Sequence, residues 1–158
     1  MSLGSFSYPL PVNEPVLSYA PGTPERAKIK ARIAELKSEC PEIPMRFGGK
    51  EILTGKLSDI RPPHETKRLL GRFHVGGKEH VQMAIDSALA AKPAWEDMPW
   101  EDRAGIFLKA ADLIATKHRW TMNATTMLGQ SKNVFQAEID SACEIIDFLR
   151  FNVAFLDQ

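Results

Sequence analysis

Cysteine is scarce in this chain: its 158 residues include only two, Cys40 and Cys143. A disulfide framework needs more cysteines than this. A structural zinc site needs Cys or His residues in pairs at short spacing, and the four histidines do not supply them. The scarcity of cysteine therefore favours a protein of a reducing compartment.

An excess of charge of one sign is also missing, because 20 Lys and Arg residues balance 20 Asp and Glu residues. Without a basic excess or interleaved aromatic residues, we expect no nucleic-acid partner. No apolar run approaches the roughly 20 residues that span a bilayer, so we expect no membrane segment. Residues 1–10 lack a basic n-region and an Arg-rich amphipathic pattern, which predicts a cytoplasmic protein.

Apolar residues make up 44% of the chain and charged residues 25%, which is typical of a globular domain with a core of its own. Four of the eleven prolines fall within residues 1–22. Proline fixes φ and removes a backbone donor, so this segment is predicted to be an extended N-terminal arm. We expect residues 23–158 to form the folded part.

A helix and a small antiparallel sheet are predicted next along the chain. Thr23-Pro24-Glu25 is a typical helix start, and the apolar spacing predicts a helix to about Ser38. Gly48-Gly49 permits the positive φ angles of a two-residue hairpin turn. The predicted strands are 43–47, 50–54, 56–60 and 69–75.

A run of about four helices is predicted after Gly76-Gly77. The expected ranges are 78 to about 91, 101 to about 116, 118 to about 128, and 133 to about 155. Pro93 is expected to end the first of them. The last carries apolar residues on more than one side, which predicts burial on several faces and favours a piece of something larger. The segment itself is of the α+β class.

Several chemical motifs are absent. Gly71–Lys78 resembles a phosphate-binding loop. That loop requires Lys and then Ser or Thr directly after its second glycine, whereas Gly77, Lys78 and Glu79 follow Gly76 here. No G-x-G-x-x-G dinucleotide motif occurs, and no two histidines have the spacing of a helical metal site. Cys143 precedes Glu144, but adjacent helical residues point about 100° apart. We therefore expect Cys143 to be a buried, inert thiol.

Acidic residues gather on the last predicted helix, at Glu138, Asp140, Glu144 and Asp147. Glu144 shares a face with Asp140 and Asp147, and like charges at this spacing repel. One interpretation is a solvated face with Lys132 and Arg150 nearby. The other is that one of these acids faces a ligand that carries an amino group.

Three segments together resemble the aldehyde dehydrogenases: Asn13–Val16, Asp102–Ile114, and Thr126–Asp140 with its continuation to Asn152. The longest of them is most similar to the branch that oxidises L-glutamate γ-semialdehyde. The resemblance covers residues 12–158. Ser131 stands where many relatives have glycine, which alters the rigidity of the turn before Lys132.

The resemblance implies an α/β parent enzyme with a Rossmann-like NAD domain, of which residues 23–158 form the N-terminal portion. In relatives the nucleophilic cysteine, the general base and the cofactor-binding loops lie further along the chain. Accordingly no catalytic, NAD-binding or metal-binding residue is assigned here. The position of Glu144 implies a substrate contact at the amino end of the aldehyde.

The function implied is that of the N-terminal segment of an oxidoreductase acting in proline degradation. The parent enzyme would oxidise L-glutamate γ-semialdehyde to L-glutamate with reduction of NAD⁺, and would form a homo-oligomer. Its partner would be a small-molecule aldehyde, and the 158-residue chain alone is expected to be inactive. The alternative is a complete, non-catalytic binding or regulatory module derived from that family.

Overall fold

The computed structural model describes residues 8–156. Its helices are α1 (Pro24–Ser38), α2 (Lys78–Asp97), α3 (Trp100–Leu113), α4 (Arg119–Gln130), α5 (Val134–Ala137) and α6 (Glu144–Leu156). Two π-helical segments are η1 (Ile114–His118) and η2 (Glu138–Cys143). The strands are β1 (Glu42–Ile43), β2 (Met45–Phe47), β3 (Lys50–Ile52), β4 (Leu57–Ile60) and β5 (Gly71–His74).

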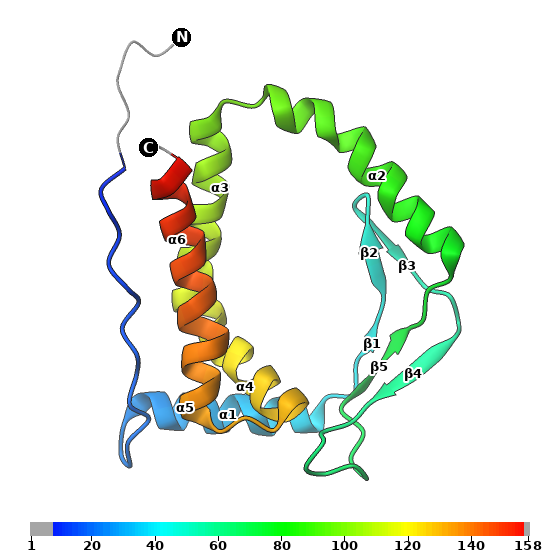
Figure 1. Ribbon diagram of the computed structural model, residues 1–158. Helices are drawn as coiled ribbons and strands as arrows, with labels where there is room; N and C mark the ends of the chain where they lie inside the picture. The colour runs from blue at the N-terminus through cyan, green and yellow to red at the C-terminus, as the bar shows by residue number, and fades with distance from the viewer. Residues whose placement is uncertain (1–7, 157–158) are drawn as a thin grey trace.

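These elements follow one another around an open ring (Figure 1). The segment before α1 is extended and runs alongside α6, so the first and last parts of the described chain are neighbours. Helix α1 crosses the base of this helical half. The strands lie on the opposite side, and α2 leads from them back to α3.

Helix α1 begins where the sequence predicts. The hydroxyl of Thr23 accepts a hydrogen bond from the backbone N–H of Arg26, and Pro24 occupies the first helical position. Ile29 of α1 is buried with Tyr19 and Ala124 in a small core. Partly buried side chains surround this core: Leu17, Ile33, Leu36, Trp120, Met127 and Val134. Helix α1 is thereby fixed against α4.

The predicted hairpin is confirmed. Strands β2 and β3 pair antiparallel, with Met45 opposite Ile52 and Phe47 opposite Lys50. Gly48 and Gly49 have φ angles of 60° and 72°, the left-handed region that a tight two-residue turn requires and that glycine adopts without strain.

The small antiparallel sheet predicted from the sequence is instead two sheets, one of which contains a parallel pair. Strand β4 pairs antiparallel with β5, and β1 pairs parallel with the other edge of β5. Gly55, with a φ angle of 73°, turns the chain away after β3. Nδ1 of buried His74 then accepts hydrogen bonds from the backbone N–H groups of Thr54 and Gly55, at 3.0 and 3.2 Å. These bonds direct the chain towards β5.

The predicted end of α2 near Ala91 is also wrong, because this helix continues through Pro93 to Asp97. Proline lacks an N–H group and leaves the carbonyl four residues earlier, that of Leu89, without its helical partner. Leu89 is exposed, and no residue of α2 is buried. Water can therefore satisfy the freed carbonyl, which makes an internal proline tolerable here.

The predicted break between two helices near residue 117 is absent. Helix α3 passes through the π-helical segment η1 directly into α4. The last helix begins at Val134, after Asn133 accepts a hydrogen bond from the N–H of Gln136. It continues to Leu156, interrupted by the second π-helical segment, η2.

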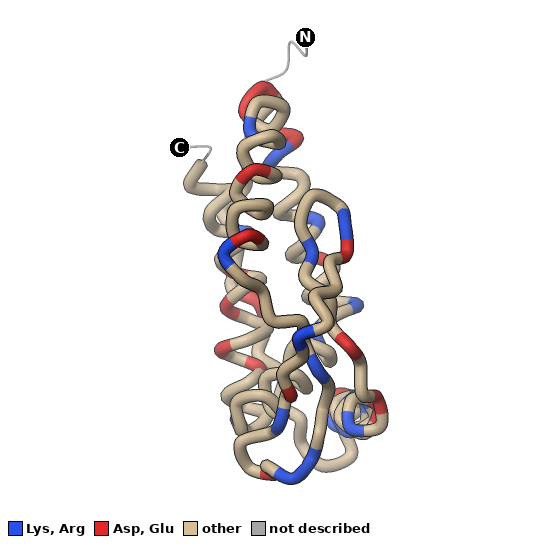
Figure 2. Tube along the Cα trace, turned by 90° about the vertical axis from the view of Figure 1, so that its right-hand side faces the viewer, with Lys and Arg blue, Asp and Glu red and all other residues tan. Residues whose placement is uncertain are grey.

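Helix α3 packs against α6. The fully or nearly fully buried side chains of these two helices are Ala104, Ala111, Ile146, Val153 and Ala154. Within residues 8–156, no helix is long and apolar enough to cross a membrane. Positive and negative side chains are interspersed along the chain trace, as Figure 2 shows.

Candidate functional site

The site is built around η2, whose wider turn changes the direction of the helix that follows. The backbone N–H of Glu144 donates to the carbonyl of Ile139, five residues earlier. This bond is of the π type, whereas an α-helix bonds residue i to residue i−4. Glu144 is thus the first residue of α6 and lies directly after the π turn.

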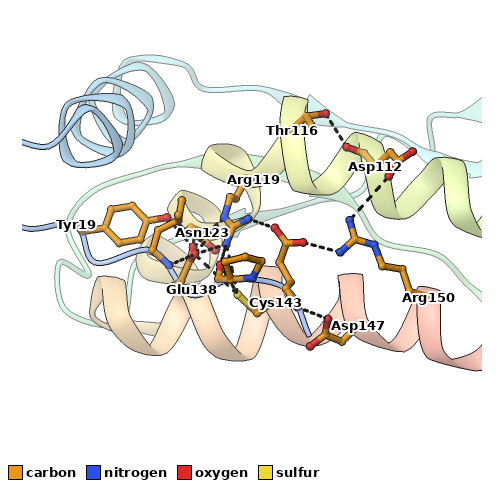
Figure 3. Close-up of polar contacts among 12 residues, drawn as sticks. Tyr19, Asp112, Thr116, Arg119, Asn123, Glu138, Cys143, Asp147 and Arg150 are labelled. Carbon is orange, nitrogen blue, oxygen red and sulfur yellow. Dashed lines mark hydrogen bonds and ion pairs between the residues drawn. The ribbon is translucent and has the colours of Figure 1, made fainter. Parts of the chain in front are cut away.

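The carboxylate of Glu138, at the start of η2, is fully buried and accepts hydrogen bonds from the thiol of Cys143 at 3.9 Å and from four further residues (Figure 3). These four donors are the N–H of Leu17 at 2.9 Å, the hydroxyl of Tyr19 at 2.6 Å, the amide of Asn123 at 2.6 Å, and the guanidinium of Arg119. A buried charge is costly unless it is paired and hydrogen-bonded, and this one is both.

Arg119 connects the arm, α4 and η2. Arg119 is buried, with a residue exposure of 3%, and its guanidinium forms an ion pair with Glu138. It also pairs with Glu14 and donates to the carbonyl of Pro15 at 2.7 Å. A further contact, at 3.5 Å, reaches Sγ of Cys143. Arg119 therefore contacts both the first and the last residue of η2.

Residues 13–20 are docked on this region by directed hydrogen bonds. Asp147 accepts from the side-chain amide of Asn13 and the backbone N–H of Glu14, both at 2.7 Å. Arg150 donates to the second oxygen of Glu14 at 2.6 Å. Tyr19, almost fully buried, has a φ angle of 52°, a strained value for a residue with a side chain. The contacts to Glu138 and Asn123 hold Tyr19 in this conformation.

The ionisation states follow from these contacts. Burial raises the pKa of Glu138, but hydrogen bonds from Arg119 and Tyr19 outweigh it and leave that pKa below its ordinary value. Burial and the neighbouring Glu138 raise the pKa of Tyr19. Burial, together with the charge of Glu138, raises the pKa of the Cys143 thiol to about 11. Cys143 is thus buried and protonated at neutral pH, which is unsuitable for a nucleophile.

Acid should weaken the fold through Glu138. Its folded-state pKa lies below the unfolded value of about 4.3. Its contribution to the free energy of unfolding is therefore fully present above that pH and is lost as the pH falls through the folded-state pKa. Urea unfolding between pH 7 and pH 3 should show a shallower fall for Glu138→Gln than for the unmodified chain. Parallel pH curves would contradict this assignment.

A cavity of about 580 Å³ lies between the arm and α6. Its acidic lining residues are Glu14, Glu144 and Asp147, and its aromatic ones are Phe148, Phe151 and Phe155. Carboxylates beside aromatic rings suit a cationic group such as an ammonium. Glu14 and Asp147 already have partners, whereas Glu144 is exposed and makes no ion pair within residues 8–156. Glu144 is the acid available to a ligand in this cavity.

The two interpretations of the acidic helix apply to different residues. Asp140 is a surface acid that pairs with Lys132 at 2.6 Å. Arg150 does not pair with Glu144 but turns to Glu14, with Asp112 at 3.8 Å. The solvated-face interpretation thus describes Asp140, and the ligand interpretation is left to Glu144.

Residues 8–156 contain no group of three or more His, Cys, Asp or Glu side chains able to hold a metal ion. The glycine turn before α2 does not fit a cofactor phosphate either. The carboxylate of Glu79 lies where a Cβ on Gly77 would fall, and Nδ1 of His80 accepts the N–H of Gly77 at 3.0 Å. A negative group already lies at the start of α2, which disfavours the binding of a phosphate there.

Sequence reasoning did not identify Arg119 or Tyr19, and it counted Glu138 only as one more surface acid. One signal was present: the apolar residues of the last helix do not follow a single face, which is what a π turn within the helix produces. The partners themselves are separated by up to 119 positions in the chain. No local pattern brings them together.

The aldehyde dehydrogenase family model matches residues 54–158. The chain belongs to the aldehyde dehydrogenase family, and the resemblance described above is confirmed.

Curated relatives extend the similarity over almost the whole chain. It is 50% identical over 157 residues to the delta-1-pyrroline-5-carboxylate dehydrogenase of Agaricus bisporus, covering 99% of this chain and 29% of that protein. It is 46% identical over 154 residues to the probable delta-1-pyrroline-5-carboxylate dehydrogenase of Schizosaccharomyces pombe, covering 97% and 28%. The chain thus spans less than a third of the length of these relatives.

Solved structures give the same result for the fold. The delta-pyrroline-5-carboxylate dehydrogenase of Mycobacterium tuberculosis superposes with a TM-score of 0.96 at 40% identity, over 100% of this chain and 29% of that one. The same enzyme bound with NAD superposes equally well, over 99% and 30%. The expected α+β segment of an α/β aldehyde dehydrogenase is therefore confirmed.

Proposed function

We propose that this chain forms the N-terminal part of an NAD-dependent dehydrogenase that oxidises L-glutamate γ-semialdehyde to L-glutamate in proline degradation. This aldehyde is in equilibrium with 1-pyrroline-5-carboxylate. The observation that carries the proposal is the 50% identity to the Agaricus bisporus enzyme over 99% of this chain. The backbone agreement with the NAD-bound Mycobacterium tuberculosis enzyme supports it.

Within such an enzyme, residues 1–22 would be the arm and residues 23–158 the first portion of the NAD-binding domain. Exposed apolar side chains support a further polypeptide covering this segment. On α2 they include Val81 and Leu89, and on α6 Phe148, Phe155 and Leu156, each between 57% and 61% exposed. Large apolar side chains exposed to this extent are typical of surfaces that are covered in an assembly.

A chimera tests the function. The matching segment of the Mycobacterium tuberculosis enzyme would be replaced by this chain, which shares its backbone at a TM-score of 0.96. We expect NADH production from glutamate semialdehyde at a kcat within about tenfold of the unmodified enzyme. A folded chimera that binds NAD but turns over only simple aldehydes would contradict the substrate assignment. The 158-residue chain alone is expected to produce no NADH, because Cys143 is a buried thiol that stays protonated at neutral pH.

Glu144 is proposed to hold the α-amino group of the substrate by charge and hydrogen bonding, with no covalent role. In the chimera, Glu144→Ala should raise KM for glutamate semialdehyde by about tenfold, since a charge-assisted hydrogen bond contributes roughly 1.5–3 kcal/mol. KM for propanal, which has no amino group, should change less than twofold. Steady-state kinetics with both aldehydes measures this difference.

The control for this prediction is Glu96→Ala. Glu96 is an exposed acid on α2 that pairs with Lys92 at 3.3 Å and does not line the cavity. The Glu96→Ala substitution removes the same charge and leaves the proposed contact intact, so KM should change for neither glutamate semialdehyde nor propanal. Equal increases in KM for both aldehydes on replacing Glu144 would exclude an amine-binding role.

Assembly and location are also proposals. A homo-oligomer is proposed for the whole enzyme, with light scattering of the chimera as its test. We propose a cytoplasmic location from the scarcity of cysteine. The relative from Dictyostelium discoideum carries the word mitochondrial in its name. Fractionation of cells that express the native gene distinguishes the two compartments.

A further inference from the structure

The direction in which Glu144 points depends on η2. Each residue of an α-helix turns the chain by about 100°, and a π turn accommodates one extra residue within a helix. Everything after η2 is therefore rotated by about 100° from where an uninterrupted α-helix would place it. The N–H of Glu144 makes the π-type bond to Ile139 itself, so this rotation applies first to Glu144.

The π turn is held at its beginning, middle and end. Arg119 bonds the carboxylate of Glu138 and contacts Sγ of Cys143, the two ends of η2. Between them, the hydroxyl of Ser141 donates to the carbonyl of Met122 at 3.3 Å. That hydroxyl in turn accepts a hydrogen bond from Thr126 at 2.8 Å. All of these partners outside η2 lie on α4.

We propose that Arg119 and Glu138 are positioning residues for the substrate. Their buried ion pair (Figure 3) holds the π turn that directs Glu144 into the cavity beside the arm. The proposal rests on the function proposed above for Glu144. Neither Arg119 nor Glu138 lines this cavity, so in this proposal neither touches the substrate and both act by positioning Glu144.

The geometry explains why a charged pair is used. A π turn is rare and widens the helix, so it persists only where surrounding contacts favour it over the α-helical alternative. The Glu138 carboxylate can accept from Leu17, Tyr19, Asn123 and Arg119 together only while η2 keeps its present path. A neutral amide at this position cannot accept all of these bonds and cannot pair with the guanidinium. Relaxation of the turn would rotate Glu144 away from the cavity.

The test is a double-variant cycle in the chimera with Glu138→Gln, Glu144→Ala and their combination. The measured quantity is the ratio of KM for glutamate semialdehyde to KM for propanal, with kcat for each. Glu138→Gln alone should raise this ratio at least threefold. In the Glu144→Ala background it should raise the ratio no further, because the side chain it positions is gone.

Two further variants separate positioning from loss of stability. Tyr19→Phe removes one donor to Glu138 and keeps the ion pair, so it should raise the ratio in the same direction, by less, even if Glu138→Gln does not fold. Leu128→Val lowers stability where α4 faces Ile43 and Ile60, away from Tyr19 and Glu138. It should lower the Tm and leave the ratio unchanged.

The outcomes distinguish the two proposals. If Glu144→Ala raises the ratio while both Glu138→Gln and Tyr19→Phe leave it unchanged, the positioning role is excluded and the substrate contact of Glu144 stands. An additive increase in the combined variant would exclude action through Glu144. If Glu144→Ala itself leaves the ratio unchanged, the substrate contact fails and the positioning proposal fails with it.

Discussion

Replacing Arg119 with methionine is expected to destabilise the chain by about 3–5 kcal/mol, the usual cost of removing one partner of a buried ion pair. The reason is the charge left behind: Glu138 is fully buried, and its remaining donors are neutral. Glu14 loses its contact with Arg119 at the same time, so the arm is loosened as well. Urea unfolding, followed by tryptophan fluorescence, measures the change in the free energy of unfolding. The ring of the nearby Trp120 lies edge-on to that of Tyr19, with 6.1 Å between the ring centroids. Its fluorescence should therefore change when the arm is loosened.

Lys132→Met is the matched control, because it removes a cation from an ion pair of similar length. The pair of Lys132 with Asp140 is 2.6 Å long, but its side chains are 31% and 43% exposed. Exposed pairs contribute about 0–1 kcal/mol. A similar loss of stability in the two variants would show that burial of Glu138 is not the source of the effect.

Ile146→Ala should cost about 2–5 kcal/mol, since truncating a buried isoleucine loses apolar burial and leaves a cavity. Ile146 of α6 is 0% exposed and sits in the helix that packs against α3. The same unfolding experiment gives the free-energy change. Native proteins have a margin of only about 5–15 kcal/mol, so this change alone should shift the unfolding midpoint strongly.

The residue next to Ile146 provides the comparison. Ile145 precedes Ile146 in the same helix but is 36% exposed. Truncating Ile145 to alanine removes the same atoms from a site that water already reaches, so the cost should be smaller by 1 kcal/mol or more. Equal costs would mean that the burial assigned to the α3–α6 contact is wrong.

Local patterns in the sequence were sufficient for the elements whose signals are local. The Thr23-Pro24 start of α1, the Gly48-Gly49 turn and the Asn133 start of the last helix all agree with the structure. Each depends on residues within a few positions of one another. The positions of these helix starts and of the turn can therefore be predicted from a few neighbouring residues.

The predictions failed where a distant contact or solvent decides the outcome. Pro93 does not end α2, because an exposed helix can leave one carbonyl to water. Strand β4 pairs with β5 rather than with the hairpin, and His74 fixes the intervening loop across 20 positions. Neither effect is visible in hydrophobic periodicity.

The candidate site was accessible only in part. The resemblance led to Glu144, whose substrate contact stays a prediction. The groups that surround it were not visible: Glu138 meets Arg119 at a separation of 19 positions and Tyr19 at 119. Charged residues are mostly exposed in folded proteins, so a sequence pattern predicts them on the surface. A fully buried ion pair with this many partners is an exception.

The docking of the arm on α6 has a consequence for synthesis on the ribosome. Glu14 bonds to Asp147, a residue 133 positions later. At about 5–20 residues per second, Glu14 is synthesised roughly 7–27 s before Asp147. The strands and α1–α4 can form in that interval, whereas the arm has to wait for the final helix. The arm, although translated well before the final helix, is thus among the last segments to reach its native position.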